Sequence, residues 1–301
     1  MPTRQGSFRL FRLFGIDVYL HWIWFLYAAY RISTRDGGYT SMGWNALEFL
    51  TIFSIVLVHE FGHALACKSV GGKADFIVLW LFGGVAYVAP PQRPGATLWS
   101  IAAGPLVNVV LVPVLEALRQ VSRSLDWKHA LPNLATFVFI IWFMNLLMLG
   151  FNLLPIYPLD GGQILRSLLW YAFGRARSLM IACVIGFIGV AVMLGLAVWW
   201  QSWWIGVLCL LIVVPNCWQG FQQAQALLRL AKAPRHEGFA CPSCLAAPVK
   251  GEFWVCGQCR KAFDTFVTQG VCPQCATQFP TTACLECGRK YPMAEWMARA
   301  R

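Results

Sequence analysis

Apolar residues along this chain gather in long runs that are separated by short polar segments. Several runs approach the roughly 20 residues that a helix needs to cross a bilayer. The pattern predicts six spanning helices, at Val18–Ile32, Trp44–Val70, Ala96–Leu118, Leu134–Leu154, Leu179–Trp200 and Trp203–Phe221. We therefore expect an all-α polytopic membrane protein with about six transmembrane helices.

Composition and charge agree with this class. Hydrophobic residues make up 58% of the chain and charged residues 12%, proportions that exclude an ordinary soluble enzyme. Basic residues concentrate in the loops that lie on the same side of the bilayer as the N-terminus. The positive-inside rule therefore predicts a multi-pass protein of the cell membrane with both termini in the cytoplasm. This orientation and contact with anionic membrane lipid account for the net charge of +11, and we do not expect nucleic acid as a partner.

The segment between the second and third spans is too short to cross the bilayer twice as a helical hairpin. Residues from Phe76 to Val88 are rich in β-branched and aromatic side chains, which favour strands. We expect a membrane-associated β-hairpin or re-entrant loop that turns at Gly83 and Gly84, with an edge that binds an extended substrate segment. A plain interfacial loop is the alternative.

Near the end of the second run stands the sequence His59-Glu60-Phe61-Gly62-His63. Histidines four positions apart lie on one face of a helix and are able to bind a single Zn2+ together. The glutamate between them is placed to take a proton from an activated water molecule. These residues predict a zinc hydrolase that works inside a membrane, with Glu60 as its catalytic residue.

A third zinc ligand must come from a segment that reaches the same depth. With the second helix running toward the cytoplasm, Asp75 and Asp160 both meet this condition. Asp160 is favoured, because Pro155 and Pro158 interrupt a regular helix and Gly161-Gly162 permits a tight approach. Irregular backbone at membrane depth is found where protein or a water-filled cavity covers it. The alternative role for Asp160 is to cap the helix that follows.

Four motifs, in this order, resemble the site-2 proteases, a family of intramembrane zinc metalloproteases. They are His-Glu-Phe-Gly-His at 59–63, Phe-Gly-Gly-Val-Ala at 82–86, Ala-Ala-Gly-Pro-Leu-Val-Asn at 102–108, and the segment 152–162 with its Leu-Asp-Gly-Gly ending. The resemblance implies hydrolysis of a peptide bond within or near the transmembrane segment of a membrane-tethered protein substrate, as in regulated intramembrane proteolysis. It also implies that His59, His63 and Asp160 hold the catalytic zinc.

Two asparagines are the polar residues expected to face the cavity. The resemblance places Asn152, which precedes Asp160 by eight residues, close to the site, where it is expected to donate to an oxyanion or to hold the substrate backbone. Asn108 is expected to line the same cavity. Hydrogen bonding between helices is the alternative role for both asparagines.

The tail of the chain is a separate module. We expect a membrane domain at 1–230, a polar linker at 231–239 and a tail at 240–301 that carries four Cys-x-x-Cys pairs, at Cys241 and Cys244, Cys256 and Cys259, Cys272 and Cys275, and Cys284 and Cys287. Eight thiolates match two structural zinc sites beside the single catalytic zinc, each able to hold a small fold that has too little core to stand alone. Sequential pairing would give two zinc ribbons and alternate pairing would interleave them, and the spacing does not decide between these arrangements.

The tail also suggests a partner. A zinc-ribbon-like module recruits a protein, senses zinc or redox state, or contacts nucleic acid. The mild charge imbalance of this tail does not choose among these roles, and we expect a cytoplasmic protein partner. Two functions follow for the whole chain: an active intramembrane protease, or a proteolytically silent scaffold that presents the ribbons to a cytoplasmic complex. Glu60 favours the protease, because a scaffold would not require it.

Overall fold

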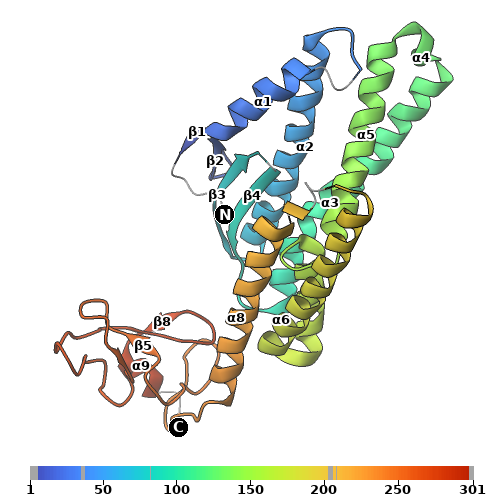
Figure 1. Ribbon diagram of the computed structural model, residues 1–301. Coiled ribbons are helices and arrows are strands. Elements are labelled where there is room, and N and C mark those ends of the chain that lie inside the picture. Colours follow the sequence, from blue (N-terminus) through green and yellow to red (C-terminus); the bar gives the residue numbers. More distant parts are fainter. Residues whose placement is uncertain (1–5, 35–37, 82, 203–205, 208, 298–301) are drawn as a thin grey trace. The chain divides into compact units, whose positions relative to one another are not determined.

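The computed structural model describes residues 6–34, 38–81, 83–202, 206–207 and 209–297. The chain divides into two compact units, Met1–Gln222 and Gln223–Arg301. Figure 1 shows both units.

The first unit is mostly helical. Its helices within the described residues are α1 (Trp22–Thr34), α2 (Met42–Ser69), α3 (Pro94–Ser124), α4 (Trp127–Ala130), α5 (Pro132–Leu153), α6 (Asp160–Trp199), the π-helix η1 (Cys209–Val213) and α8 (Val214–Lys232), which runs on into the second unit. Four of them, α2, α3, α5 and α6, are long and apolar enough to cross a membrane. The spans predicted at Trp44–Val70, Ala96–Leu118 and Leu134–Leu154 fall on α2, α3 and α5.

A four-stranded sheet lies beside these helices. The unit is mostly helical, as expected, and contains two strands beyond the predicted hairpin. Its strands are β1 (Ser7–Leu13), β2 (Ile16–His21), β3 (Lys73–Trp80) and β4 (Gly83–Ala89), in the spatial order β1-β2-β3-β4. β2 and β3 are parallel, and the two outer pairings are antiparallel. The predicted hairpin between the second and third spans is confirmed as β3–β4. Gly83 and Gly84 open β4 instead of forming its turn, since Trp80 pairs with Gly83.

The first predicted span, Val18–Ile32, is wrong at its start, because Val18 to His21 belong to strand β2. The physical reason is period-two burial: Ile16, Val18 and Leu20 alternate with polar or aromatic residues, and these three side chains are buried in the sheet. They pack with Ile77 of β3 and, from α2, with residues that include Phe61, Ala64 and Cys67. The sheet is thereby fixed to the half of α2 that contains His59 and His63.

The last two predicted spans differ in extent from the helices of the structure. Except for Trp200, the span at Leu179–Trp200 is part of α6, which starts at Asp160 and is divided by a sharp bend at Gly174 (φ 74°, ψ 171°). The irregular segment 154–159 separates α5 from α6, as the two prolines predict. Of the span at Trp203–Phe221, residues 203–205 and 208 lie outside the described residues, and the described part holds η1 and the start of α8.

The second unit has little regular structure. Beyond the end of α8 it contains four two-residue strands, β5 (Trp254–Val255), β6 (Ala262–Phe263), β7 (Thr282–Ala283) and β8 (Lys290–Tyr291), and the short helix α9 (Met293–Met297). β5 pairs with β6, and β7 with β8. Its small core is formed by Phe266 and Trp296 together with buried cysteines.

Candidate metal centre

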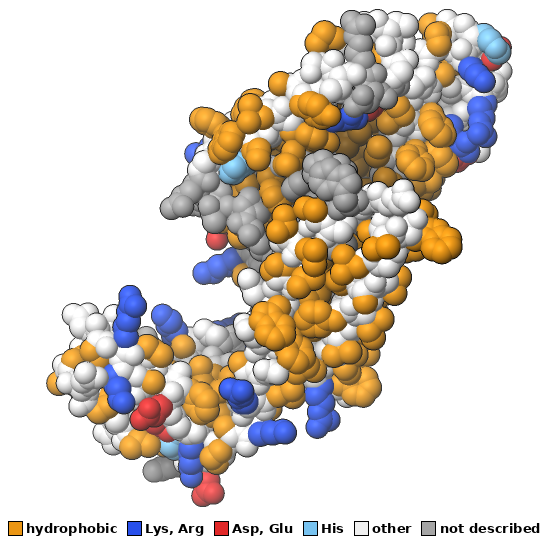
Figure 2. Space-filling view, in the orientation of Figure 1, with side chains coloured by type: hydrophobic (Ala, Val, Ile, Leu, Met, Phe, Trp, Pro, Cys, Tyr) orange, Lys and Arg blue, Asp and Glu red, His pale blue; other side chains and the backbone are white. Residues whose placement is uncertain are grey.

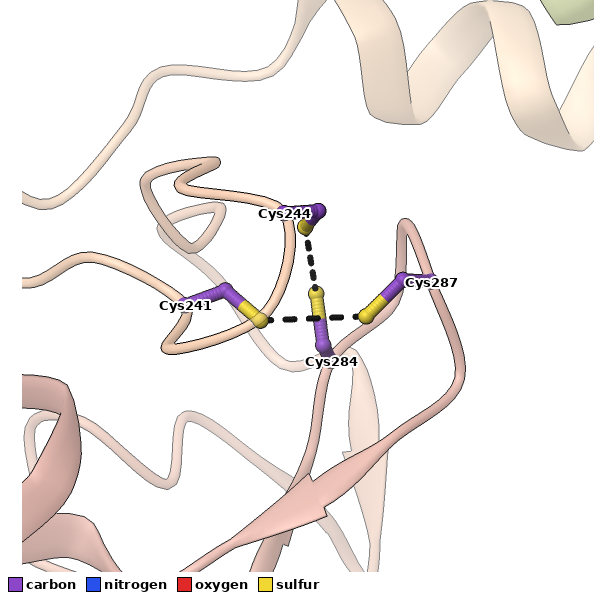
Figure 3. Close-up of side chains that lie close together, drawn as sticks. All are labelled: Cys241, Cys244, Cys284 and Cys287. Atoms are coloured by element: carbon purple, nitrogen blue, oxygen red, sulfur yellow. Dashed lines mark hydrogen bonds between the residues drawn. The ribbon is translucent and has the colours of Figure 1, made fainter. Parts of the chain in front are cut away.

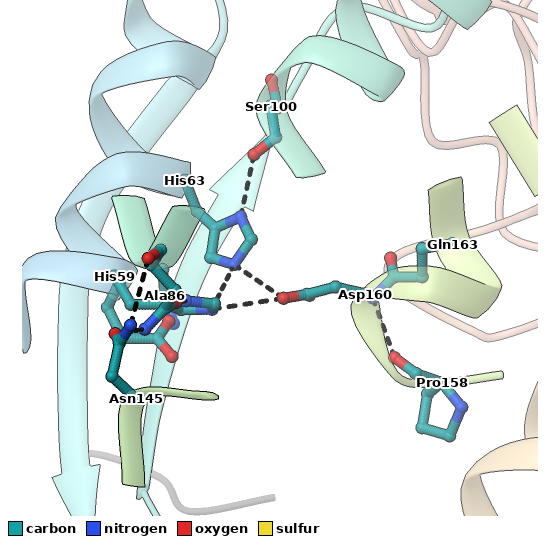
Figure 4. Close-up of polar contacts among 10 residues, drawn as sticks. His59, His63, Ala86, Ser100, Asn145, Pro158, Asp160 and Gln163 are labelled. Atoms are coloured by element: carbon teal, nitrogen blue, oxygen red, sulfur yellow. Dashed lines mark hydrogen bonds and ion pairs between the residues drawn. The ribbon is translucent and has the colours of Figure 1, made fainter. Parts of the chain in front are cut away.

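Three side chains from two helices converge inside the helical unit (Figure 4). His59 and His63 lie one turn apart on α2, and Asp160 is the first residue of α6. The Oδ2 atom of Asp160 lies 3.2 Å from Nε2 of His59 and 3.3 Å from Nε2 of His63, and the two Nε2 atoms are 3.1 Å apart. Both histidines are buried. The carboxylate thus faces the histidine pair, and Asp160 makes no side-chain cap of α6.

This triangle fits a zinc ion. Ligand atoms about 2.0–2.1 Å from a tetrahedral Zn2+ are about 3.4 Å from one another. The observed separations of 3.1, 3.2 and 3.3 Å are close to that value. Three protein ligands also leave one position of a tetrahedral ion free, which is the arrangement of catalytic zinc sites.

Helix α3 orients both imidazoles. Oδ1 of Asn108 lies 2.6 Å from Nδ1 of His59, and the backbone oxygen of Ser100 lies 2.9 Å from Nδ1 of His63. Each contact fixes the tautomer in which Nε2 is free to bind a metal. The Asn108 amide in turn donates to Oδ1 of Asn145 on α5 at 2.8 Å, and Asn145 donates back to the Asn108 backbone oxygen at 3.1 Å.

Gly104 makes room for the metal between Ser100 and Asn108 on the same face of α3. A Cβ atom at Gly104 would collide with Nε2 and Cε1 of His63 and would lie 2.8 Å from Nε2 of His59. Even the smallest side chain would therefore fill the space toward which the ligand atoms point. Ser100, Gly104 and Asn108 are spaced four residues apart and so form one stripe of the helix.

Glu60 is next to the ligands and outside their triangle. Its Oε2 atom accepts a hydrogen bond of 2.7 Å from the backbone N–H of Ala86 in β4. A Cβ atom at Gly84, two residues earlier in the strand, would lie 2.5 Å from Cγ of Glu60. Since β4 is an edge strand and the Ala86 N–H is directed at Glu60 instead of β3, the free edge of this strand faces the metal site.

The remaining predicted site residues lie outside the triangle of metal ligands. Gly83 has open space around it, and Asp75 is an exposed residue of β3 away from the triangle. Asn152 is half-buried on α5, and among the described residues it makes no hydrogen bond to the three ligands. Asn145 and Gly104 were missed by the sequence reasoning. Each residue had a signal in the sequence. Asn145 is a polar residue inside an apolar span, and Gly104 stands midway between Ser100 and Asn108, four residues from each.

In the second unit the eight cysteines form two groups of four. Cys241 and Cys244 meet Cys284 and Cys287 (Figure 3), while Cys256 and Cys259 meet Cys272 and Cys275. The Sγ–Sγ distances are 3.7 Å for Cys241 to Cys287 and for Cys244 to Cys284, 3.5 Å for Cys256 to Cys275, and 3.6 Å for Cys259 to Cys272. Tetrahedral Zn–S bonds of about 2.3 Å require about 3.8 Å between sulfurs. The grouping is nested, with the outer motifs around the inner ones, and is neither sequential nor alternate.

All four motifs share one backbone turn. In each, the N–H of the first cysteine donates to the carbonyl five residues later, and its carbonyl accepts from the N–H four residues later. The residue in that fourth position has positive φ in every case: Leu245 (60°), Arg260 (59°), Ala276 (55°) and Gly288 (75°). Non-glycine residues rarely adopt this conformation. Its repetition at three such residues indicates that cysteine placement dictates the local backbone.

Comparison with known proteins agrees with this geometry. Residues 121–196, which include Asn145 and Asp160, match the model of peptidase family M50. The chain is 37% identical over 183 residues, 60% of its length and 50% of the relative's, to the zinc metalloprotease MJ0392 of Methanocaldococcus jannaschii. It is 36% identical over 118 residues, 38% of each chain, to stage IV sporulation protein FB of Bacillus subtilis. The chain spans half or less of the length of these two relatives.

A solved structure is also similar. The site-2 protease from Methanocaldococcus jannaschii superposes with a TM-score of 0.51 and 29% sequence identity, covering 71% of this chain and 95% of that one. The chain is thus similar to M50 peptidases and to a site-2 protease of known structure.

Proposed function

We propose that this protein is an intramembrane zinc metalloprotease that hydrolyses a peptide bond within or near the transmembrane segment of a membrane-tethered protein. The observation that carries the proposal is the triangle of His59, His63 and Asp160, with ligand atoms 3.1–3.3 Å apart. A carboxylate that is not needed as a ligand, Glu60, lies beside it. The ligands come from two separate apolar helices, which supports chemistry at membrane depth.

The site residues have different chemical roles in this proposal. A Zn2+ held by His59, His63 and Asp160 would supply Lewis-acid activation of a water molecule and of the scissile carbonyl. Glu60 accepts the proton of the attacking water and delivers it to the leaving amine. Asn108 and the Ser100 backbone hold the two imidazoles in the ligating tautomer. We retain Asn152 as a residue that holds the substrate backbone.

The substrate segment is proposed to bind as an additional strand on the free edge of β4. Transmembrane substrates are helical, and their carbonyls are inaccessible until the helix opens. A strand edge binds the opened backbone by main-chain hydrogen bonds without requiring one side-chain sequence. Such a segment would compete with Glu60 for the N–H of Ala86, so binding at this edge would release the carboxylate for catalysis. Gly83 and Gly84 keep the first part of the edge free of side chains.

The remaining features complete the proposal for the whole chain. We propose about six crossings, the first of which includes α1. Both termini are proposed to be cytoplasmic. We keep the domain boundaries expected from the sequence. In the cytoplasm, the tail is proposed to bind two structural zinc ions and to contact a protein.

The decisive experiment compares the parent with Glu60→Gln on a panel of membrane-tethered single-span substrates in proteoliposomes. Loss of a general base is expected to reduce cleavage by about 10²–10⁴-fold. Zinc content is measured in parallel and should be unchanged, because Glu60 is not a ligand.

Glu48→Gln is the matched control, since Glu48 is a second buried carboxylate on α2 and lies eleven residues from His59. It should leave both cleavage and zinc content near the parent values. Equal cleavage by the parent and Glu60→Gln would rule out the proposed mechanism.

A further inference from the structure

The hairpin β1–β2 has an unusual turn. Leu13 pairs with Ile16, so Phe14 and Gly15 form a two-residue connection, and both have positive φ, 51° and 71°. Such turns favour Asn-Gly, because a bulky side chain is strained there. Phe14 is nevertheless 65% exposed. A strained position that keeps an exposed aromatic ring suggests that the ring has a role outside the fold.

The level of this turn in the membrane follows from α2. With 28 residues, α2 is about 42 Å long, close to the thickness of about 40–45 Å of a bilayer with its headgroups. Its last turn, which contains Lys68, therefore lies at a lipid–water boundary. Nζ of Lys68 donates a 2.7 Å hydrogen bond to the backbone oxygen of Phe14. The aromatic turn thus lies at headgroup level.

The strand that leads to the turn has an apolar exposed surface. Phe8, Leu10, Phe11 and Leu13 of β1 are all exposed. The Phe8 ring packs edge-on against Phe25 of α1 at 6.3 Å, and Phe25 is itself exposed, so the apolar surface continues from β1 onto α1. In the space-filling view, hydrophobic side chains likewise gather over the helical unit (Figure 2).

Positive charge accompanies this apolar surface. Arg9 and Arg12, both exposed, approach the same carboxylate, Asp17, at 2.8 and 3.8 Å. One carboxylate is thus paired with two guanidinium groups, which leaves an excess of positive charge. Lys68 adds a third cation close to the turn. Excess basic charge beside aromatic side chains at headgroup level is the combination that binds anionic lipid surfaces.

We propose that the β1–β2 hairpin is a lipid-binding element that inserts Phe14 and the apolar side chains of β1 at the acyl-chain boundary, with Arg9, Arg12 and Lys68 against anionic headgroups. At this depth water and headgroups are still able to hydrogen-bond the edge of β1, which has no strand partner on its outer side among the described residues. The hairpin also contacts the catalytic helix, because the Phe14 ring meets the ring of Phe61, the neighbour of Glu60, at 6.5 Å.

The test is photo-crosslinking of the full chain in nanodiscs of phosphatidylcholine with or without phosphatidylglycerol. Phe14→p-benzoylphenylalanine is compared with the same replacement of Val267, an equally exposed residue of the tail. We expect lipid adducts at position 14 to exceed those at position 267 by at least about tenfold, and to increase with phosphatidylglycerol. The readout needs no catalytic activity, so it succeeds or fails independently of the proposed protease function.

A second pair of variants tests the charge. Arg9→Gln with Arg12→Gln should reduce the enrichment of phosphatidylglycerol over phosphatidylcholine adducts toward one, whereas Arg260→Gln in the tail should leave it unchanged. Adducts at position 14 that join two protein chains, or a lipid yield no higher than at position 267, would overturn the proposal. An unchanged lipid preference in the double arginine variant would also contradict it.

Discussion

The two kinds of candidate metal site in this chain are built in opposite ways. In the helical first unit, which we call the membrane unit, the three ligands come from α2 and α6, about 100 residues apart. Helix α3 holds both imidazoles in place, and α5 supports α3 through Asn145. In the tail, every ligand belongs to a short turn whose backbone repeats four times, and the buried sulfurs Cys241 and Cys284 are part of the small core. The fold of the membrane unit positions its three ligands, whereas the cysteine turns determine the fold of the tail.

This difference assigns different roles to the metal. A site that helices position without help from an ion is able to leave one coordination position open for chemistry. A site whose ligands constitute the core uses all four positions, because metal binding and folding are then the same event. The membrane unit should therefore keep its structure without zinc, whereas the tail should lose it.

The largest expected effect is in the tail. Cys284→Ser removes one ligand of the outer group, and the tail should lose one zinc and much of the roughly 10 kcal/mol that a structural zinc site contributes. Zinc content by mass spectrometry and limited proteolysis of the tail measure both losses. Cys183→Ser is the control, since this buried thiol belongs to neither group. A tail that resists protease in Cys284→Ser would show that the metal is not its core.

The second prediction concerns the space for the catalytic metal. Gly104→Ala places a methyl group against both histidine rings and should weaken zinc binding in the membrane unit by more than about 100-fold, the upper end of effects from neighbouring residues. The zinc of the tail should remain. Gly150→Ala on α5 is the control, because a Cβ there meets open space. Normal zinc content in Gly104→Ala would place the metal elsewhere.

The third prediction separates two asparagines. Asn108→Ala removes the partner of His59 Nδ1 and should lower the zinc affinity of the membrane unit about 10–100-fold. Asn152→Ala should leave this affinity unchanged, whatever its effect on cleavage. Competition with a zinc chelator gives both affinities. Equal affinities for the parent and Asn108→Ala would show that Asn108 does not support His59 as a metal ligand.

The smallest effect tests whether the tail also depends on ordinary hydrogen bonds. Burial alone would raise the pKa of Asp264, but hydrogen bonds from the N–H groups of Gly251 and Phe266 and from His236 lower this pKa below its usual range. A carboxylate with a lowered pKa stabilises the folded state above its unfolded pKa of about 3.9. That stabilisation is lost as the pH falls through the lower, folded value.

Asp264→Asn should therefore reduce the stability of the tail at pH 7 by about 1–2 kcal/mol, measured by urea unfolding of the zinc-loaded protein. Glu252→Gln, at an exposed acid close in sequence, should have no effect. A loss as large as that caused by Cys284→Ser would mean that the metal does not dominate the tail.

Much of the metal site was predictable from local patterns. The spacing of His59 and His63 and the prolines before Asp160 are signals within single segments, and the structure brings these residues together. The strand Ile16–His21 was missed because its alternation is short and merges with the apolar helix that follows. The roles of Asn145 and Gly104 depend on which face of α3 meets α2 and α5, and that is decided by packing between segments distant in the sequence.

The nested order of the cysteine motifs has a consequence for biosynthesis. The inner group closes a short loop, from Cys259 to Cys272, whereas the outer group must join Cys244 to Cys284 across 40 positions. Closing a shorter loop costs less chain entropy, and once it is closed the distance left for the outer motifs is reduced. A ribosome also completes the inner pair of motifs before it reaches Cys284 and Cys287, the second half of the outer group. The emerging tail is therefore expected to take up its inner ion while the last motif is still being synthesised, and to bind its outer ion only after that motif has emerged.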